Sequence, residues 1–301
     1  MELRQLHYMI ALVEEGSVTR AARRLNVVQP AISMQIRKLE DELGHRLFQR
    51  TPKGMIPTSI GNEAYRLFVP LLHDLRAAKD QLSSLGGKVV GKISIGVIGS
   101  VSNNALSKCL ESFCTRYPHV SVRITGGYTM DFIEMLQIGA LDLAVINQSR
   151  VRTNLAVTPI AREDLHLVYA VSNPIKLPDP VPITTISGLK LVIPSTRHGL
   201  RNIIDDAAAG AGARLEPLLE FDELKTIEEF VQVTDFVAIL PCHSISATVK
   251  QGTLRSLAIA PGIARDIVCV HNPKRGLSPA AEFFIAELRE SMNSAVETAG
   301  I

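Results

Sequence analysis

In the first 60 residues the apolar positions follow helical spacing. They recur every three or four residues, at Leu3, Leu6, Ile10, Val13, Ile32, Ile36, Leu39 and Leu43. This pattern predicts amphipathic helices over 3–15 and 29–43, with a short helix between them that Ser17 would cap. The third helix would begin at Gln29-Pro30, where the missing N–H of proline costs nothing, and would end at Gly44.

Two further elements follow. Extended pieces at 47–50 and 55–58, joined by Pro52-Lys53-Gly54, predict a β-hairpin with a basic tip. Residues 61–85 then form a helical pattern in which Pro70 should introduce a kink or mark the true start. Its apolar stripe alternates three- and four-residue steps, through Phe68, Leu71, Leu75, Ala78, Leu82 and Leu85. Such a stripe is typical of a coiled-coil seam and predicts dimerisation, although packing of this helix on its own domain is the alternative.

From residue 88 onward the pattern changes to strands that alternate with helices. Strands are predicted at 93–98, 120–124, 141–146, 165–171, 190–193, 236–240 and 267–271. The strand at 141–146 is continuously apolar, as in a buried parallel sheet. The alternation predicts an α/β domain of two lobes, preceded by a helical domain at 1–60 and a linker helix with its hinge at 61–87.

Composition and charge narrow the classes of function. The net charge of +2 means that any contact with DNA must come from a local cluster of basic residues. The four cysteines, at 109, 114, 242 and 269, have neither CxxC spacing nor a nearby histidine at zinc-ligand spacing, so we expect no metal site, disulfide framework or cofactor. The chain shows no signal peptide or membrane-spanning run, and a cytoplasmic location without a membrane partner is expected.

The first three predicted helices match the helix-turn-helix plan, in which the second helix of the motif enters the major groove. The candidate DNA-contacting residues are Ser17, Thr19, Gln29, Pro30, Ser33, Met34, Arg37, Arg50 and Lys53. Pro30 can touch thymine methyl groups, Arg37 can reach phosphate or guanine, and the basic hairpin suits phosphate or the minor groove. For each residue alone, a solvated charged face is the simpler alternative, but the whole arrangement favours DNA.

The same segment carries a family resemblance. Residues 16–61 read GSVTRAARRLNVVQPAISMQIRKLEDELGHRLFQRTPKGMIPTSIG, which resembles the N-terminal signature of the LysR-type transcriptional regulators, and the resemblance continues along essentially the full chain. Two positions depart from it. Val28 stands where a small hydroxyl residue is usual, and Met34 stands where arginine is frequent.

This resemblance implies a winged helix-turn-helix, a long linker helix and a two-lobed effector domain like a periplasmic binding protein. Subdomain I would comprise 88–161 plus 268–301, and subdomain II would comprise 162–267. The implied partners are double-stranded DNA with pseudo-palindromic sites, a small-molecule effector and RNA polymerase. The implied assembly is a homotetramer, built as a dimer of dimers.

Polar loops in the α/β domain predict where a ligand binds. In open α/β sheets, ligands bind at the carboxyl ends of strands, beside helix N-termini. The candidate residues are Ser100, Ser102, Asn103, Thr129, Asn147, Thr196, Arg197 and His198. Helix capping is the alternative for any one loop. Helix N-termini together with Arg197 and His198 favour a small anionic ligand, a carboxylate. Asp235 departs from the turn usual in the family, with no functional meaning that we can assign.

Two other classes of protein, an enzyme and a solute-binding protein, fit the sequence less well. No triad, metal spacing or glycine-rich phosphate loop is present, and GVIGS at 96–100 has the wrong glycine spacing for a dinucleotide site, so an enzyme is not expected. A transport-type solute-binding protein would account for the α/β domain. The helix-turn-helix pattern and the lack of a signal peptide argue against it.

Overall fold

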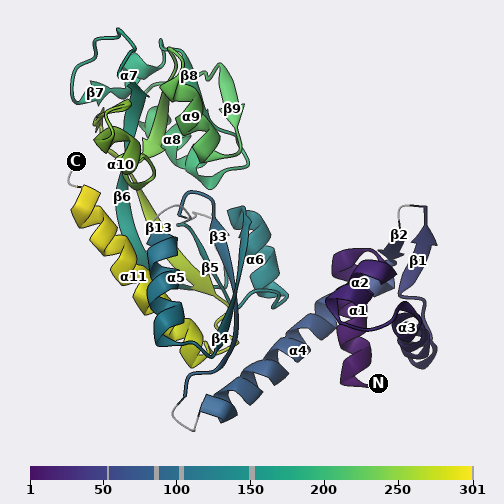
Figure 1. The fold of residues 1–301 in the computed structure, drawn as a ribbon. Helices are drawn as coiled ribbons and strands as arrows, with labels where there is room; N and C mark the ends of the chain where they lie inside the picture. The colour runs from purple at the N-terminus through teal and green to yellow at the C-terminus, as the bar shows by residue number, and fades with distance from the viewer. Residues whose placement is uncertain (53, 85–87, 102–104, 149–152, 300–301) are drawn as a thin grey trace. The chain divides into compact units, whose positions relative to one another are not determined.

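The computed structural model describes residues 1–52, 54–84, 88–101, 105–148 and 153–299 (Figure 1). Its contacts divide the chain into two units. The first comprises Met1–Ser83 with Gln137–Ala140, and the second comprises Ser84–Leu136 with Leu141–Ile301. Within the described ranges, no helix has both the length and the apolar character needed to cross a membrane.

The N-terminal unit begins with three helices, α1 (Leu3–Glu15), α2 (Val18–Arg24) and α3 (Gln29–Leu43). Their apolar stripes meet in one core, in which Met9, Ile32 and Leu39 are fully buried. Gly16 and Gly44 end α1 and α3 with φ of 60° and 72°, the left-handed conformation that glycine adopts without strain.

A β-hairpin follows, formed by β1 (Phe48–Thr51) and β2 (Gly54–Pro57). The buried carboxylate of Glu40 in α3 accepts hydrogen bonds from the backbone N–H groups of Leu47 at 2.8 Å and Phe48 at 3.2 Å. At the other end, the Met55 N–H donates to the carbonyl of Gly16 at 3.0 Å. A Cβ on Gly54 would lie 2.5 Å from that carbonyl oxygen, so the close approach requires glycine. The hairpin is thus fixed to the helices at both ends.

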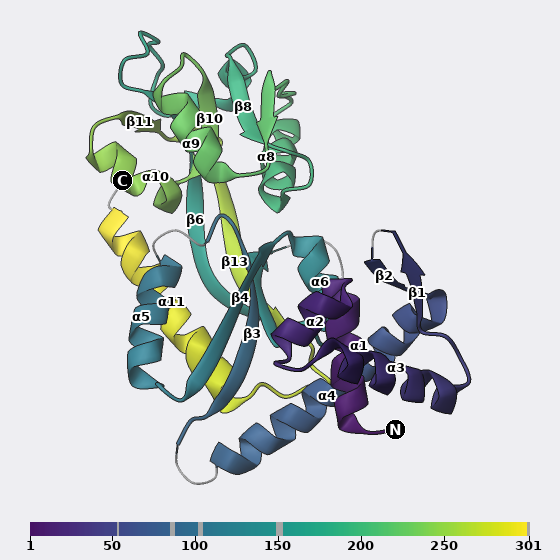
Figure 2. The same cartoon turned by 45° about the vertical axis from the view of Figure 1, so that its right-hand side comes forward.

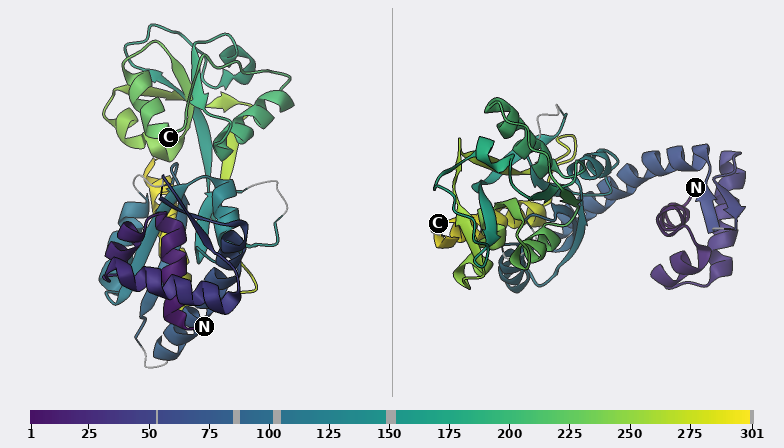
Figure 3. Two further views of the ribbon diagram at one scale, coloured as in Figure 1. Left: turned by 90° about the vertical axis from the view of Figure 1, so that its right-hand side faces the viewer. Right: turned by 90° about the horizontal axis from the view of Figure 1, so that it is seen from above.

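Helix α4 (Ser59–Ser84) runs on from the hairpin as one long helix and contains Pro70 within it (Figure 3). Phe68 and Leu72 are half-buried and pack against the core of the first three helices. By contrast, the side chains of the leucines at 67, 71, 75 and 82 are 50–70% exposed.

The second unit is built on a mixed sheet with strand order β4-β3-β5-β13-β6-β10-β8-β9, and β11 also pairs with β6. Its first elements are β3 (Gly91–Ile98), α5 (Ala105–Arg116), β4 (Val120–Gly127), α6 (Thr129–Gln137), β5 (Leu143–Asn147) and β6 (Ala156–Ala170). Then follow β7 (Val181–Pro182), α7 (Ile183–Ile186), β8 (Leu191–Pro194), α8 (Gly199–Gly210), β9 (Leu219–Phe221) and α9 (Leu224–Gln232). The last are β10 (Val237–Pro241), α10 (Cys242–Lys250), β11 (Leu254–Leu257), β12 (Ile259–Ala260), β13 (Ile263–His271) and α11 (Pro279–Ala299).

Two lobes share this sheet, and the long antiparallel strands β6 and β13 run through both of them (Figure 2). Each lobe has its own hydrophobic core. On β6 the first core includes Ile160 and the second begins at Leu165; on β13 the second core includes Ile263 and the first begins at Ile267. The predicted subdomain boundaries, 161/162 and 267/268, lie on these two strands.

Candidate DNA interface and ligand site

Four of the candidate DNA-contacting residues lie around an open hollow between α2 and α3. Thr19, Gln29, Pro30 and Ser33 line this hollow of about 640 Å³, together with Ala22, Arg23, Val27 and Val28. Met34, Arg37 and Arg50 are exposed as well. Lys53 lies outside the described residues. A surface shaped by the turn between two helices, with exposed polar groups at the start of the second, fits the helix-turn-helix docking geometry.

Ser17 has a structural role in this motif. Its hydroxyl accepts a hydrogen bond from the Arg20 N–H at 3.5 Å and so caps α2. At the start of α3 the equivalent position is Val28, whose side chain offers no cap, so the first N–H groups of α3 receive no side-chain acceptor there.

Ion pairs divide the basic residues of this unit into two groups. Arg24 pairs with Glu14 at 2.5 Å, and Arg20 pairs with Glu15 at 3.6 Å. Arg37 and Arg50 have no carboxylate partner in the part of the chain that the structure describes. Their charge is available for phosphate, which is the main source of affinity in protein–DNA complexes.

Phe68, the first residue of the predicted dimerisation seam, does not belong to the exposed apolar stripe of α4. Phe68 packs on its own domain, and the exposed apolar stripe instead starts at Leu67 and continues through Leu71, Leu75 and Leu82. Leu71, Leu75 and Leu82 follow steps of four and seven residues, the spacing of a coiled-coil face, whereas Leu67 lies one residue before the heptad position.

In the second unit, four of the predicted ligand-binding residues come together. Ser100 follows β3, Thr129 starts α6, Asn147 ends β5 and His198 is the N-cap of α8, and each is less than 10% exposed. A Cβ on Gly199 would lie 3.4 Å from Thr129 Oγ1 and 3.5 Å from Asn147 Nδ2. The start of α8, from one lobe, thus lies directly against residues of the other lobe.

The remaining predicted residues lie elsewhere. Thr196 and Arg197 are exposed, and the Arg197 guanidinium lies 4.7 Å from the centroid of the Tyr128 ring, a cation–π contact. Ser102 and Asn103 lie outside the described residues.

His198 does not supply the positive charge that the sequence suggested. Burial and the nearby Arg265 lower the pKa of His198 to about 4. Its Nδ1 accepts a hydrogen bond from the Leu200 N–H at 3.2 Å, which also requires that nitrogen to be unprotonated. His198 is therefore a neutral helix cap at pH 7.

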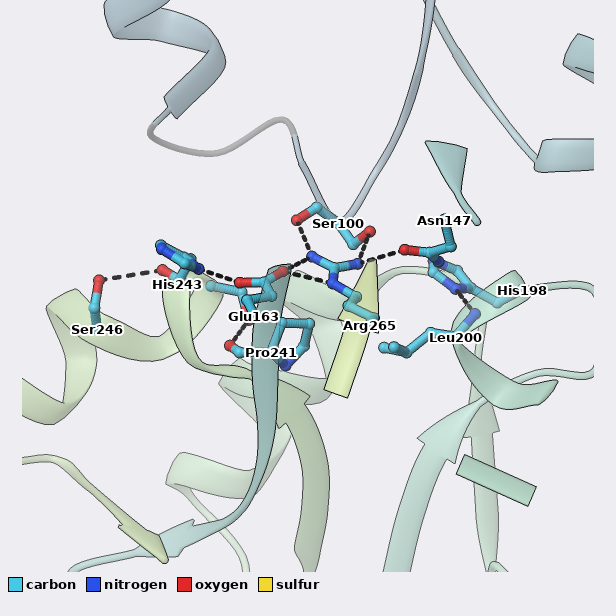
Figure 4. Close-up of polar contacts among 10 residues, drawn as sticks. Ser100, Asn147, Glu163, His198, Leu200, Pro241, His243, Ser246 and Arg265 are labelled. Atoms are coloured by element: carbon cyan, nitrogen blue, oxygen red, sulfur yellow. Dashed lines mark hydrogen bonds and ion pairs between the residues drawn. The ribbon is translucent and has the colours of Figure 1, made fainter. Parts of the chain in front are cut away.

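The main charged group of the site, Arg265 on β13, was missed from the sequence (Figure 4). It is only 1% exposed, and all five of its N–H groups donate to partners. Nε and Nη2 bond to Glu163 Oε1, Nη1 bonds to Ser100 Oγ and to Asn147 Oδ1 at 3.1 Å, and Nη2 also bonds to the Ser100 carbonyl at 3.2 Å. Arg265 thus has no donor left for a ligand.

Glu163 on β6 balances this charge. Burial raises the pKa of Glu163, but Arg265 and a hydrogen bond with His243 Nδ1 outweigh burial, so that its pKa lies below the ordinary value and the carboxylate is ionised. His243 is the second residue of α10, which belongs to the lobe with the second hydrophobic core. The network thus joins both lobes and both crossing strands.

Arg265 also fixes the orientation of the Asn147 amide. A guanidinium has only donors, so the oxygen Oδ1 must face it and the NH₂ group must face away. Asn147 Nδ2 is buried and directed at the start of α8, and it has no hydrogen-bond partner among the residues that the structure describes. A buried donor without an acceptor is uncommon and costly.

A sequence signal for this network existed. In an otherwise apolar pair of strands, Arg162-Glu163-Asp164 and Arg265-Asp266 are short charged interruptions. Charges in the middle of a strand that must cross a core mark either a sheet edge or a buried ion pair. Only the register, in which Arg265 opposes Glu163, tells the two apart.

Neither metal nor thiol chemistry has clear support. Across the described ranges, no cluster of three His, Cys, Asp or Glu side chains is placed to hold a metal ion. Burial raises the pKa of Cys109, Cys242 and Cys269 to about 12, which keeps these thiols protonated and unreactive. Cys114 is exposed on α5.

The geometry so far defines a class: a helix-turn-helix DNA-binding unit joined to a two-lobed α/β ligand-binding domain. Comparison with known families agrees. The profile described as "Bacterial regulatory helix-turn-helix protein, lysR family" matches residues 3–62, and that described as "LysR substrate binding domain" matches residues 86–293. The chain belongs to the LysR family of DNA-binding transcriptional regulators, which are not enzymes, as the sequence predicted.

Individual relatives resemble the chain over its whole length. The hydrogen peroxide-inducible genes activator of Haemophilus influenzae is 26% identical over 301 residues, covering 99% of each chain. Full-length OxyR from Pseudomonas aeruginosa has a TM-score of 0.72 at 20% identity, covering 97% of each chain. CbnR complexed with its target DNA has a TM-score of 0.67 at 23% identity, covering 97% of this chain and 100% of CbnR. These structures confirm the predicted fold.

Proposed function

We propose that this regulator binds a small molecule bearing an anionic acceptor group, a carboxylate, between the two lobes of its effector domain. The observation that carries the proposal is the buried Asn147 Nδ2 at the start of α8, an oriented donor that has no acceptor within the described ranges. Thr129 Oγ1 lies on the same side and can add a second hydrogen bond. A ligand oxygen would satisfy the Asn147 donor.

Electrostatics favour a negative charge at this position. The N-terminus of α8 carries partial positive charge. Burial is the main cause of the lowered pKa of His198, and the nearby positive charge of Arg265 adds to it. Because Glu163 already neutralises much of Arg265, the ligand would bind through Asn147 and the helix rather than by direct contact with the guanidinium.

In the structure Gly199 lies close to Thr129 and Asn147, since a Cβ on Gly199 would be in van der Waals contact with both. Ligand entry would require the lobes to separate by bending of β6 and β13. Binding would then favour one lobe arrangement over another and alter the DNA-bound assembly.

On the DNA side, α3 would enter the major groove, with Gln29, Pro30, Ser33, Met34 and Arg37 near base edges or phosphates and Thr19 on the adjacent backbone. Arg50 would contact phosphate or the minor groove, and the sequence predicts the same of Lys53. Two chains would pair through the exposed leucines of α4, and two dimers would form a tetramer on pseudo-palindromic sites. The assembly would act on RNA polymerase in the cytoplasm, where promoter DNA lies.

Peroxide sensing, suggested by the names of several relatives, is the second candidate function. It requires a reactive thiolate. Three of the four cysteines are buried and held protonated. The fourth, Cys114, is exposed, but no other cysteine is exposed that could form a disulfide with it. These observations do not favour it.

The test is a thermal-shift screen of small carboxylates on the full chain, because a ligand that binds the folded state raises its Tm. In Asn147→Asp the donor becomes an acceptor of the same shape, so we expect the shift to disappear, while exposed Thr196→Ala keeps it. A neutral or cationic compound whose shift survives Asn147→Asp would contradict the proposed ligand class. A gel-shift assay with the chain's upstream DNA tests the DNA side separately.

A further inference from the structure

The recognition helix α3 exposes apolar side chains on the side away from its core. Its core-facing residues Ile32, Ile36 and Leu39 are at most 5% exposed, whereas Met34 is 53% exposed and Val28 is 70% exposed. Single exposed apolar residues are common on protein surfaces. Here they occur together on the element that enters the DNA groove, so their chemistry bears on what the protein recognises.

Val28 is unexpected at its position for a second reason. It is the N-cap residue of α3, with φ −83° and ψ 145°, and its side chain makes no capping hydrogen bond. Valine is among the least favoured residues at this position, where Ser, Thr, Asp or Asn would accept a helix N–H. The side chain therefore neither caps the helix nor packs in the core, which leaves a contact outside the folded domain as its remaining role.

The surroundings of Val28 are partly apolar. The hollow between α2 and α3 has Ala22, Val27, Val28 and Pro30 in its wall, with Thr19, Arg23, Gln29 and Ser33 as polar neighbours. Met34 follows Pro30 by four residues and so lies on the same face of the helix, one turn further along. An apolar strip thus continues from the hollow along α3.

The chemistry of the DNA groove determines which group can contact this apolar strip. Among base edges in the major groove, the 5-methyl group of thymine is the one apolar feature. Arg23, Arg37 and Lys38 are exposed nearby and complement the phosphates on either side. We propose that Val28 and Met34 are specificity-determining residues that contact thymine methyl groups in the target half-site. The proposal rests on the assignment of α3 as the DNA-contacting helix.

The experiment compares thymine with deoxyuridine, which pairs identically and lacks only the methyl group. The full chain selects duplexes from a random library, and the best duplex is then remade with single thymines replaced by deoxyuridine. Affinity is measured by fluorescence anisotropy at one fixed salt concentration. We expect about a fourfold loss at one or two thymines of each half-site, the factor that corresponds to about 0.8 kcal/mol for one buried methyl group.

Two near-isosteric variants connect each residue to a base. Val28→Thr exchanges one methyl for a hydroxyl, and Met34→Gln exchanges the thioether for an amide. In each variant, the affinities for the thymine and deoxyuridine duplexes should become equal at the base that the substituted residue contacts. The difference in affinity should remain at the base that the other residue contacts. Because the ratio compares two DNAs on one protein, a change in helix stability from the new cap of Val28→Thr cancels. Val233→Thr, at an exposed valine of the other unit, is the control.

The outcomes separate the proposal from the function on which it rests. Equal binding of thymine and deoxyuridine duplexes by the wild-type chain would overturn methyl recognition and leave DNA binding intact. No selection from the library at all would count against the assignment of α3 to DNA. A change of oligomeric state in the Val28 and Met34 variants, with the base ratio unaltered, would assign the strip to a protein contact and also overturn the proposal.

Discussion

Arg265 and Glu163 face each other as register partners on β13 and β6, at the point where the two hydrophobic cores of the effector domain meet. Both side chains are almost completely buried. A buried ion pair is retained only where each charge keeps its partner and its hydrogen bonds, because the loss of one member leaves an uncompensated charge. This pair therefore makes the crossing between the lobes sensitive to single substitutions.

The first prediction concerns that pair. Arg265→Met leaves the Glu163 carboxylate buried without its counter-ion, and we expect it to lower the free energy of unfolding of the effector domain by about 3–5 kcal/mol. Urea unfolding followed by circular dichroism measures the loss. Arg162→Met is the matched control, at an exposed arginine of β6 that pairs with Asp266 on β13 at 3.5 Å, and it should cost less than about 1 kcal/mol. A small effect of Arg265→Met would show that the network is not a stabilising element.

His198 gives a prediction about pH. Its pKa is about 4 in the folded chain, below the ordinary histidine value, so the unfolded chain binds a proton at a higher pH than the folded one. Stability should therefore fall as the pH decreases from about 6.5 to about 4, with at most about 3 kcal/mol from this group.

The control for His198 is His198→Asn, which keeps an N-cap acceptor and cannot titrate. Tm measured from pH 7 to pH 4 should fall less steeply in this variant than in the wild-type chain. Burial also lowers the pKa values of the half-buried His166 and His271, which contribute to both profiles equally. Identical pH profiles for the two proteins would contradict a neutral, buried His198.

The exposed stripe on α4 predicts the effect of charge on assembly. Leu75→Glu or Leu82→Glu should weaken both oligomerisation and DNA binding, because a carboxylate would be buried in the helix seam. Sedimentation velocity and gel shifts measure the two properties. Gln81→Glu, which places the same charge at an exposed polar position, should leave them intact. Normal oligomers from both leucine variants would refute the seam.

The cysteines predict the response to oxidation. Because burial keeps Cys109, Cys242 and Cys269 protonated, we expect only Cys114 to react with a thiol reagent in the folded chain. Intact-mass spectrometry after labelling, with Cys114→Ser as the control, counts the reactive thiols. An intramolecular disulfide formed on treatment with hydrogen peroxide would instead support peroxide sensing.

Much of the fold could be predicted because its elements are local. The helices at 3–15, 29–43, 199–210 and 223–232 have strong periodicity, and the structure has them within a residue. The first half of β6 was missed because Pro159 and the charged run at 162–164 interrupt its alternation, although the long partner strand β13 accommodates both. Helix α10 was missed because Cys242-His243-Ser244 is polar and weakly helix-forming.

The candidate ligand site shows the same division between local and long-range features. Ser100, Thr129, Asn147 and His198 could be found because each follows a strand at its carboxyl end, which the sequence order reveals. Arg265 and Glu163 could not, because a charged residue in a strand is usually at the surface. Their partnership depends on the pairing of strands about a hundred residues apart, which no local pattern contains.

The close position of Gly199 against Thr129 and Asn147 has a kinetic consequence. With the proposed ligand enclosed between the lobes, its association and release would both wait for the lobes to open. The rate of the transcriptional response would then follow the opening frequency of the protein rather than the diffusion of the ligand. Even a weakly bound effector could remain long enough on the protein to outlast a brief fall in its concentration.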